Sequence, residues 1–349
     1  DFKKNFAITH FFNPPRYLNL FEVIPGPDCE KNVLDFLMDY GEKFLGKTSV
    51  LAKDTPAFIG NRIGTFGIQS LFHQVKNGEY TVEEVDKLTG TAIGRPKSAT
   101  FRTADVVGLD TLCHVANGIY ENCPDDESRN VFKLPDFLKK MLDEKMLGSK
   151  TKKGFYKKVV GKDGKSKILS LNLKTLEYNE QKKVNFETLN AARKVKSRAE
   201  KFKVLVSGDD KASHFYREVF AKMFAYVQHR VPEISDDLHS IDSALRAGFG
   251  WKEGPFEIWN YLGVKEGVDL MKKFDFEPAE WITEMVSNNY NNFYKTNKGL
   301  TECYDKNTKS YLQIPGQDGF IILKNSTDEK VIWSNKEARL IDIGDDILN

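Results

Sequence analysis

The sequence predicts a mainly α-helical chain, in which the tail of an α/β domain is followed by two tandem helical domains. Three observations indicate this class. Two strand-like runs and a helical run fill the first fifty or so residues. A long apolar helical segment follows them. Further along the chain, one pattern of aspartate and glycine occurs twice.

Bulk composition excludes several classes of protein. The 349 residues suffice for two or three domains, and 40% hydrophobic with 29% charged residues is ordinary for a soluble globular protein. A net charge of +2 argues against a nucleic-acid or membrane-surface partner. Apolar runs are too short for a membrane span. Four cysteines without a Cys-x-x-Cys pair predict a reducing compartment such as the cytoplasm, and no metal site.

The first predicted domain, residues 1–53, has the order strand, strand, helix, strand. Residues 5–12 and 18–24 read as strands separated by a proline-containing turn. Residues 29–45 carry apolar side chains at helical spacing, and residues 48–52 form a short β-branched run. This order predicts the end of an α/β domain.

The second predicted domain, residues 54–157, opens with a helix-start signal. Asp54 can cap the helix, and Pro56 suits its first turn. The segment that follows is apolar almost all round, so we expect a buried helix. Three glycines interrupt it at helical spacing, which predicts close packing of another helix or a ligand. These are Gly60, Gly64 and Gly67.

Two segments are predicted to link domains. Residues 158–205 form a hairpin and helical linker, with a hairpin over residues 155–180 turning at residues 161–164 and a basic helix over residues 186–204. Such a basic helix is more often a solvated face than a nucleic-acid site. Residues 311–349 have strand-like texture and are expected to lead to a missing C-terminal domain.

An internal repeat predicts the other helical domain, residues 206–310. In the first copy Asp86 precedes Gly94 by eight residues. In the second copy Asp242 precedes Gly250 by the same interval. Two related helical domains in tandem explain this spacing most simply.

His10 and Glu22 are the first candidate catalytic pair. If the two N-terminal strands form a hairpin, these residues lie directly opposite, with Cβ atoms roughly 5 Å apart. A carboxylate there would fix the imidazole tautomer, as in a general base held by an orienting acid. The alternatives are a core histidine bonded to backbone and an exposed strand glutamate.

Asn61 and Arg62 interrupt the apolar helix. In one interpretation Asn61 packs against backbone and Arg62 pairs with a nearby acid. In the other, Asn61 donates a hydrogen bond to a ligand oxygen in a cleft beside the α/β unit. The residues alone do not favour either interpretation.

Several of these segments resemble the L-3-hydroxyacyl-CoA dehydrogenase family. The first is the HFFNP segment at residues 10–14, followed by Glu22 and by KDTPAFIGNR at residues 53–62. Residues 94–110 resemble the helical C-terminal domain of that family, and residues 249–259 resemble a second copy of it.

The resemblance implies a remnant of a Rossmann NAD-binding domain, followed by two helical domains like the C-terminal domain of 6-phosphogluconate dehydrogenase. It places His10 as the catalytic base, Glu22 as its carboxylate partner and Asn61 beside the reacting oxygen of the substrate. The implied reaction is the NAD-dependent oxidation of (S)-3-hydroxyacyl-CoA to 3-oxoacyl-CoA in fatty-acid β-oxidation.

Departures from the family lead to further expectations. No G-x-G-x-x-G fingerprint occurs, and the chain starts with Asp1, so we expect a fragment that lacks the main NAD motif and is inactive alone. The order of domains resembles multifunctional β-oxidation proteins, in which an enoyl-CoA hydratase follows; residues 331–349 would lead into that domain. The second helical copy is expected to be structural and to complete a pseudo-dimer within one chain.

Two rival functions stay open at this point. One is a related dehydrogenase that acts on short free hydroxy acids. The other is a non-catalytic assembly module, in which the helical pair only holds partner domains.

Overall fold

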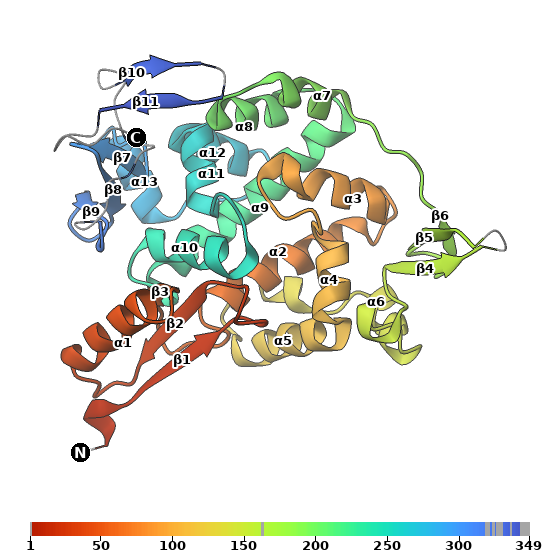
Figure 1. Cartoon of the computed structure of the whole chain (residues 1–349), viewed down its shortest axis with the longest axis horizontal. Helices are drawn as coiled ribbons and strands as arrows, with labels where there is room; N and C mark the ends of the chain where they lie inside the picture. The colour runs from red at the N-terminus through yellow and green to blue at the C-terminus, as the bar shows by residue number, and fades with distance from the viewer. Residues whose placement is uncertain are drawn as a thin grey trace.

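The computed structural model describes residues 2–161, 164–317, 322, 325, 331–335 and 337–342. A helical body carries small sheets at its periphery (Figure 1). In the described part of the chain 48% of residues are helical and 16% lie in strands. The predicted mainly α class is therefore wrong, and the chain is a mixture of α and β structure. No helix among these residues has the length and apolar character that a membrane crossing needs.

The N-terminal unit is a three-stranded sheet with one helix. Its elements are β1 (Ala7–Phe11), β2 (Leu20–Pro25), α1 (Lys31–Lys43) and β3 (Thr48–Leu51). The antiparallel β1–β2 register places His10 opposite Glu22, which confirms the predicted hairpin. β3 runs parallel to β2, because α1 provides the crossover that a parallel pair requires. β2 is therefore the central strand, and it is buried along almost all its length.

The buried helix α2 (Gly60–Val75) follows this unit. The predicted start at Asp54 is wrong, because Ala57 and Phe58 have left-handed backbone angles, with φ of 67° and 49°. The chain turns there before the helix begins. The other helices of the first helical region, residues 54–157, are α3 (Val82–Thr89), α4 (Phe101–Val107), α5 (Leu109–Asn122) and α6 (Asp136–Asp143).

Close packing along α2 was predicted from its glycines and is confirmed. A Cβ added to Gly64 would lie 2.0 Å from Cζ of Phe249, and one added to Gly67 would lie 3.1 Å from Cε of Met223. Both partners belong to helices far along the chain. Side chains of the two halves thus interlock on α2, and a single apolar core runs through both.

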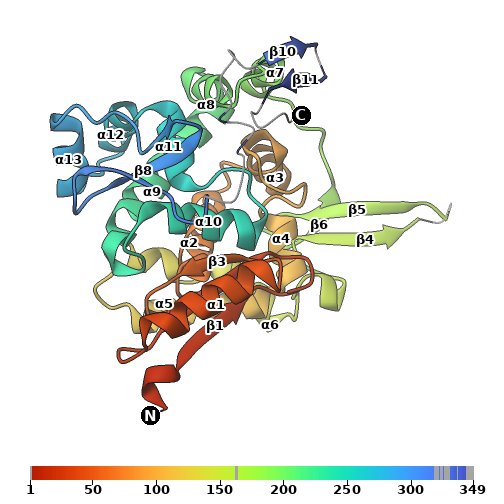
Figure 2. The same cartoon turned by 60° about the vertical axis from the view of Figure 1, so that its left-hand side comes forward.

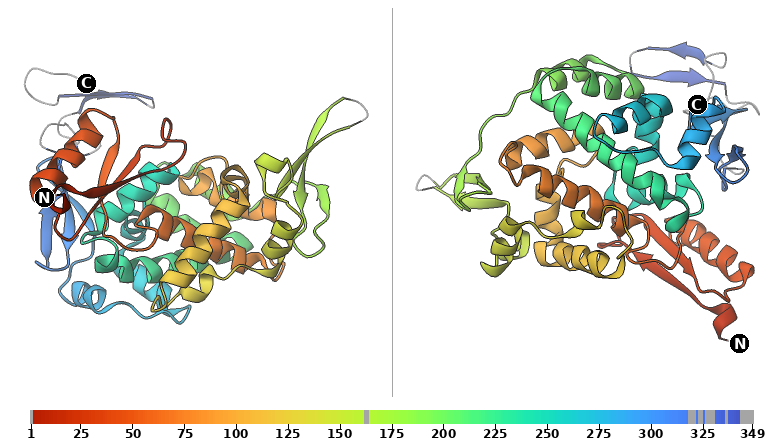
Figure 3. Two further views of the ribbon diagram at one scale, coloured as in Figure 1. Left: turned by 90° about the horizontal axis from the view of Figure 1, so that it is seen from below. Right: turned by 180° about the vertical axis from the view of Figure 1, so that it is seen from behind.

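The linker segment forms a sheet and two helices. The sheet contains β4 (Tyr156–Val160), β5 (Ser166–Leu171) and β6 (Tyr178–Glu180), and it projects from the helical body (Figures 2 and 3). The predicted hairpin thus has a third strand, and two residues of its predicted turn, Lys162 and Asp163, lie outside the described residues. The predicted single basic helix is two helices, α7 (Glu187–Lys194) and α8 (Arg198–Ser207), because Val195 is extended.

The second helical region, residues 206–310, packs against the first. Its helices are α9 (Lys211–Glu233), α10 (Leu238–Phe249), α11 (Pro255–Leu262), α12 (Val264–Lys272) and α13 (Glu280–Ser287). The strands that follow are β7 (Tyr294–Asn297), β8 (Leu300–Asp305), β9 (Ser310–Gln313), β10 (Val331–Ser334) and β11 (Arg339–Ile341). β7–β9 form one antiparallel sheet and β10–β11 a separate hairpin. The end of the predicted C-terminal linker, residues 343–349, lies outside the described residues.

The two helical regions share a buried hydrogen-bond pattern. The Asp86 carboxylate accepts a bond from the Phe101 N–H and one of 2.8 Å from the Tyr156 hydroxyl. The Asp242 carboxylate likewise accepts a bond from the N–H of Phe256. Asp242 also accepts a bond from a tyrosine hydroxyl of its own region, at 2.7 Å. Each aspartate therefore caps a following helix and is fixed by one tyrosine.

Candidate active site

The structure brings His10 and Glu22 together at the centre of the N-terminal sheet. Nδ1 of His10 lies 2.6 Å from Oε2 of Glu22. The glutamate side chain is fully buried, whereas 30% of the histidine side chain is exposed. Because a carboxylate can only accept, Nδ1 carries the proton and Nε2 presents its lone pair. No described residue hydrogen-bonds Nε2, so it is available to a substrate.

Helix α2 holds the glutamate in place. The other carboxylate oxygen, Oε1 of Glu22, accepts bonds of 3.0 and 2.9 Å from the N–H groups of Ile59 and Gly60. The left-handed backbone at Ala57 and Phe58 turns the chain just before these N–H groups. Such strain persists where surrounding structure enforces it, often at functional sites. The positive end of α2 therefore stabilises an ionised Glu22.

Asn61 lies on the first turn of α2, next to the N–H group that holds Glu22. Its side chain is half-buried and has no hydrogen-bond partner among the described residues. A buried packing amide would be bonded to backbone, so the structure favours an amide available to a ligand. The structure thus brings all three predicted site residues to one place.

Arg62 has the structural role that was one of its two predicted interpretations. Its fully buried guanidinium donates to Asp126 at 2.6 Å, to Glu233 at 2.9 Å and to the hydroxyl of Tyr226 at 2.7 Å. Arg230 of α9 donates to the same Asp126 oxygen at 2.9 Å. We call these five residues the buried charge cluster. It joins the first turns of α2 to the second helical region.

Sequence reasoning missed the aromatic surroundings of the histidine. The His10 ring lies 5.5 Å from the ring of Phe12 and 5.5 Å from that of Phe58. Phe12 in turn lies 5.3 Å from Phe249 of the second region. The two-residue spacing from His10 to Phe12 could have suggested the first contact, but nothing local could have suggested Phe249.

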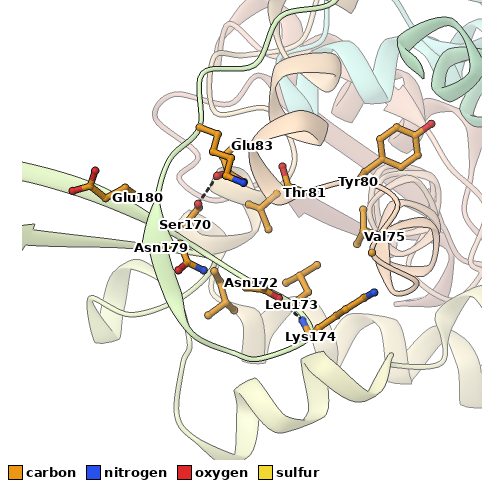
Figure 4. Close-up of a pocket in the computed structure, with 14 residues that line it drawn as sticks. Val75, Tyr80, Thr81, Glu83, Ser170, Asn172, Leu173, Lys174, Asn179 and Glu180 are labelled. Carbon is orange, nitrogen blue, oxygen red and sulfur yellow. Dashed lines mark hydrogen bonds between the residues drawn. The ribbon is translucent and has the colours of Figure 1, made fainter. Parts of the chain in front are cut away.

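A well-formed cavity lies elsewhere. It measures about 450 Å³ and lies between the C-terminal end of α2 and the β5–β6 sheet, where Ser170 bonds to Glu83 (Figure 4). Val75, on its wall, is about 21 Å along the helix from Asn61 at 1.5 Å per residue. That cavity is therefore separate from the histidine site. Within the described ranges, no group of three or more His, Cys, Asp or Glu side chains could hold a metal ion.

Two family models match the segments of the chain that carry His10, Glu22 and Asn61. The family model of the 3-hydroxyacyl-CoA dehydrogenase NAD-binding domain matches residues 1–55, and that of the C-terminal domain matches residues 58–158. A Bacillus subtilis protein named "Probable 3-hydroxyacyl-CoA dehydrogenase" is 42% identical over 348 residues, which are 99% of this chain and 43% of that protein. The chain therefore carries domains of the 3-hydroxyacyl-CoA dehydrogenase family, and the Bacillus relative bears that family's name.

Two other matches extend over most of the chain. A Rickettsia prowazekii protein named as a fatty acid oxidation complex trifunctional enzyme is 28% identical over 276 residues, which are 78% of this chain and 36% of that protein. The solved structure of 3-hydroxybutyryl-CoA dehydrogenase from Escherichia coli has a TM-score of 0.56 at 16% identity. That match covers 81% of this chain and 71% of the other, and it shows a shared fold. The chain thus spans less than half the length of the Bacillus subtilis and Rickettsia prowazekii proteins.

The family match corrects the sequence-based view of the N-terminal unit. We expected a mere Rossmann remnant without the main NAD motif, but the NAD-binding-domain model matches this unit. The motif search had tested one glycine pattern, whereas the family model matches residues 1–55 as a whole. The expectation of an inactive fragment depended on that motif and is not supported.

NAD is therefore the cofactor that the family match supports. The residues present fit the acid–base half of a dehydrogenation. They provide an imidazole lone pair at Nε2 of His10, a buried carboxylate at Glu22 that stabilises the protonated ring, and an unpaired amide at Asn61.

Proposed function

We propose that this chain carries out, within its parent protein, the NAD-dependent oxidation of (S)-3-hydroxyacyl-CoA to 3-oxoacyl-CoA. The observation that carries the proposal is the buried Glu22 carboxylate, which binds His10 with one oxygen and the first N–H groups of α2 with the other. This arrangement fixes the histidine tautomer, and Asn61 directly follows the Gly60 N–H that binds Glu22.

The proposed mechanism assigns a step to each side chain. Nε2 of His10 accepts the proton of the 3-hydroxyl as the C3–H bond breaks. NAD, when bound, supplies the acceptor for the hydride that leaves C3. Glu22 stabilises the imidazolium that results, and the Asn61 amide donates to the substrate oxygen at C3 as it becomes a carbonyl.

We further propose that the two helical regions are copies, joined as a pseudo-dimer with one catalytic site. The matching hydrogen bonds of Asp86 and Asp242 support this arrangement. The interlocked packing on α2 and the buried charge cluster supply the interface. In this proposal the domain boundaries are those predicted from the sequence.

The setting of the parent protein is also a proposal. The match to a protein named "Putative fatty acid oxidation complex trifunctional enzyme" supports a role in β-oxidation. An enoyl-CoA hydratase domain in the same parent chain is proposed from the resemblance in domain order alone. The four cysteines are unpaired, which fits a reducing compartment such as the cytoplasm.

The first test is reduction of acetoacetyl-CoA by NADH, followed at the NADH absorbance band. It uses this chain and a form extended at its N-terminus, each with and without His10→Gln. We expect the substitution to lower kcat roughly a thousandfold, because the group that accepts the proton in oxidation and donates it to the C3 oxygen in reduction is lost. His214→Gln, at an exposed histidine of α9, is the matched control and should retain activity.

The same assay separates the rival functions. Reduction of acetoacetate as efficiently as of its CoA ester would indicate a dehydrogenase of short free acids. Absence of activity from every form would contradict the proposal and favour the assembly module. Activity that is insensitive to His10→Gln would show that the histidine is not the base.

A further inference from the structure

Phe249 is a residue of the second helical region that reaches the proposed catalytic site. It ends α10, and its ring edge rests directly on Gly64 of α2, where any Cβ would lie within 2.0 Å of Cζ. Gly64 is three residues after Asn61, so both lie on the same face of the helix. The ring therefore lies one turn along that face from the proposed substrate amide.

The position of this ring is fixed against the catalytic hairpin. The N–H of Asn19 donates to the carbonyl of Ala247 at 3.1 Å. A Cβ on Gly248 would approach Leu20 and Phe12 to 2.9 and 3.0 Å. The end of α10 thus has no room to shift along the strand that carries Glu22.

Phe249 extends a row of aromatic rings that begins beside His10. Phe58 and Phe12 each lie 5.5 Å from the imidazole, and Phe12 meets Phe249 edge-on at 5.3 Å and 75°. We call these three phenylalanines the aromatic wall. Phe12 is buried, whereas Phe58 and Phe249 are half-buried and keep part of their surface accessible. The wall is therefore an apolar surface next to polar reacting groups.

The chemistry of an acyl-CoA substrate matches such a surface. Its reacting carbon carries the polar thioester on one side and an apolar acyl chain on the other. When the 3-hydroxyl lies between Nε2 of His10 and the Asn61 amide, one side of that carbon meets the aromatic wall. Burial of methylene groups there is favourable, whereas burial of the polar CoA side would be costly.

We propose that Phe249 is a specificity-determining residue, which contacts the acyl chain beyond C3 and limits the chain length that the site accepts. This inference rests on the proposed dehydrogenase function. It gives the second helical region a direct role at the substrate, although the described part of that region has no counterparts of His10, Glu22 and Asn61. It also explains why α2 has glycine at position 64, since a larger residue would push the ring toward the substrate.

The test compares kcat/KM for acetoacetyl-CoA with that for 3-oxododecanoyl-CoA. Phe249→Ala should raise the long-to-short ratio at least about tenfold, because a ring is removed from an apolar pocket. Phe249→Leu should raise it less. Gly64→Ala should lower the ratio, since the added Cβ displaces the ring in the opposite direction.

Tyr290→Ala is the matched control. Tyr290 is a half-buried aromatic residue of the same region, and its ring lies 5.2 Å from the ring of Tyr304 and 5.7 Å from that of Tyr311. Its ratio should equal that of the unmodified protein. A Phe249→Ala ratio within twofold of the control would overturn the proposal, as would an equal rise in Tyr290→Ala.

A binding measurement separates failure of this inference from failure of the proposed function. The dissociation constants of the two acyl-CoA compounds are measured in the His10→Gln background, with Phe249 or Phe249→Leu, by titration calorimetry. If no form is active, the dehydrogenase proposal fails, and a shift in binding selectivity still supports the role of Phe249. Unchanged binding selectivity would overturn that role.

Discussion

The two helical regions share a scaffold but differ in chemistry. Asp105 of the first region accepts the N–H groups of Phe155 and Tyr156 at 2.8 and 2.9 Å. Asn260 of the second region accepts the N–H groups of Phe293 and Tyr294 at 2.7 and 3.2 Å. The same turn is held in both regions, by a carboxylate in one and an amide in the other.

The regions differ in what packs against their helices. The N-terminal hairpin lies on α2, so that a helix N-terminus meets Glu22 and, through it, His10. In the second region the end of α10 contacts that same hairpin and adds Phe249. The scaffold is thus fixed by hydrogen bonds that both regions share, whereas the proposed acid–base pair lies on a single packed hairpin.

Substitution of two carboxylates, Glu22 of the N-terminal hairpin and the half-buried Glu257 of the second region, should give the largest difference between loss of activity and loss of stability. In Glu22→Gln the amide oxygen can keep the α2 N–H groups, but its NH2 then faces His10 Nδ1 and imposes the other tautomer. We expect kcat to fall roughly a thousandfold with little loss of stability. In Glu257→Gln the ion pair with Arg246 is lost. That variant should lose stability and retain kcat.

Steady-state kinetics and urea unfolding of both variants check this contrast. Equal losses of kcat in the two variants would contradict the contrast between the hairpin and the second region, because the second region would then take part in the chemical step.

The buried charge cluster should couple the regions in stability. Arg62→Met leaves the Asp126 and Glu233 carboxylates without one of their buried partners. Loss of one member of such a network costs about 3–5 kcal/mol in the free energy of unfolding. Urea denaturation measures this loss, and Arg193→Met, at an exposed arginine of α7, is the control. A loss no larger than in the control would mean that the interface does not depend on the cluster.

Sequence analysis predicted the catalytic hairpin well because its information is local. Two strand-like runs and a short turn fix the register, and simple counting then places His10 opposite Glu22. The repeat of aspartate and glycine was visible for the same reason, since each copy is encoded within one short segment.

Sequence analysis failed where a distant residue overrode a local signal. Asp54 and Pro56 form a good helix start, yet α2 begins at Gly60 because Glu22, far back in the chain, binds its first N–H groups. The contact between Phe249 and Gly64 spans 185 positions and depends on packing alone. Periodicity indicated that α2 would be buried, but not by which residues.

Removal of one tyrosine hydroxyl from each region tests the proposal that the two helical regions are copies. Tyr156 donates to the half-buried Asp86, and Tyr294 donates to the buried Asp242. Tyr156→Phe and Tyr294→Phe should each lower the free energy of unfolding by about 1.5–3 kcal/mol, since each removes a bond to a carboxyl group. Chemical denaturation would show the two losses to be alike. A loss of stability in only one of the two variants would contradict the proposal that the two tyrosines have equivalent roles.

The smallest expected effect is on pH dependence, where the regions differ by one titrating group. Burial raises the pKa of Asp105 to about 6, above its ordinary 3.8, whereas the counterpart Asn260 does not titrate. The folded state then holds the proton more tightly than the unfolded state. The resulting stability is fully present below pH 3.8 and is lost as the pH rises through about 6.

Exchange of these two side chains tests that assignment. Asp105→Asn should flatten the fall in Tm between about pH 5 and pH 7, and Asn260→Asp should steepen it, because each variant gives one region the side chain of the other. Asp86, whose pKa burial also raises to about 6, stays in both variants and provides a common background slope. Since each side chain accepts bonds from two equivalent N–H groups of its turn, the exchange should change the slope more than the maximum Tm. If neither substitution changes the slope of Tm against pH, the proton bound at Asp105 does not cause the difference between the two regions.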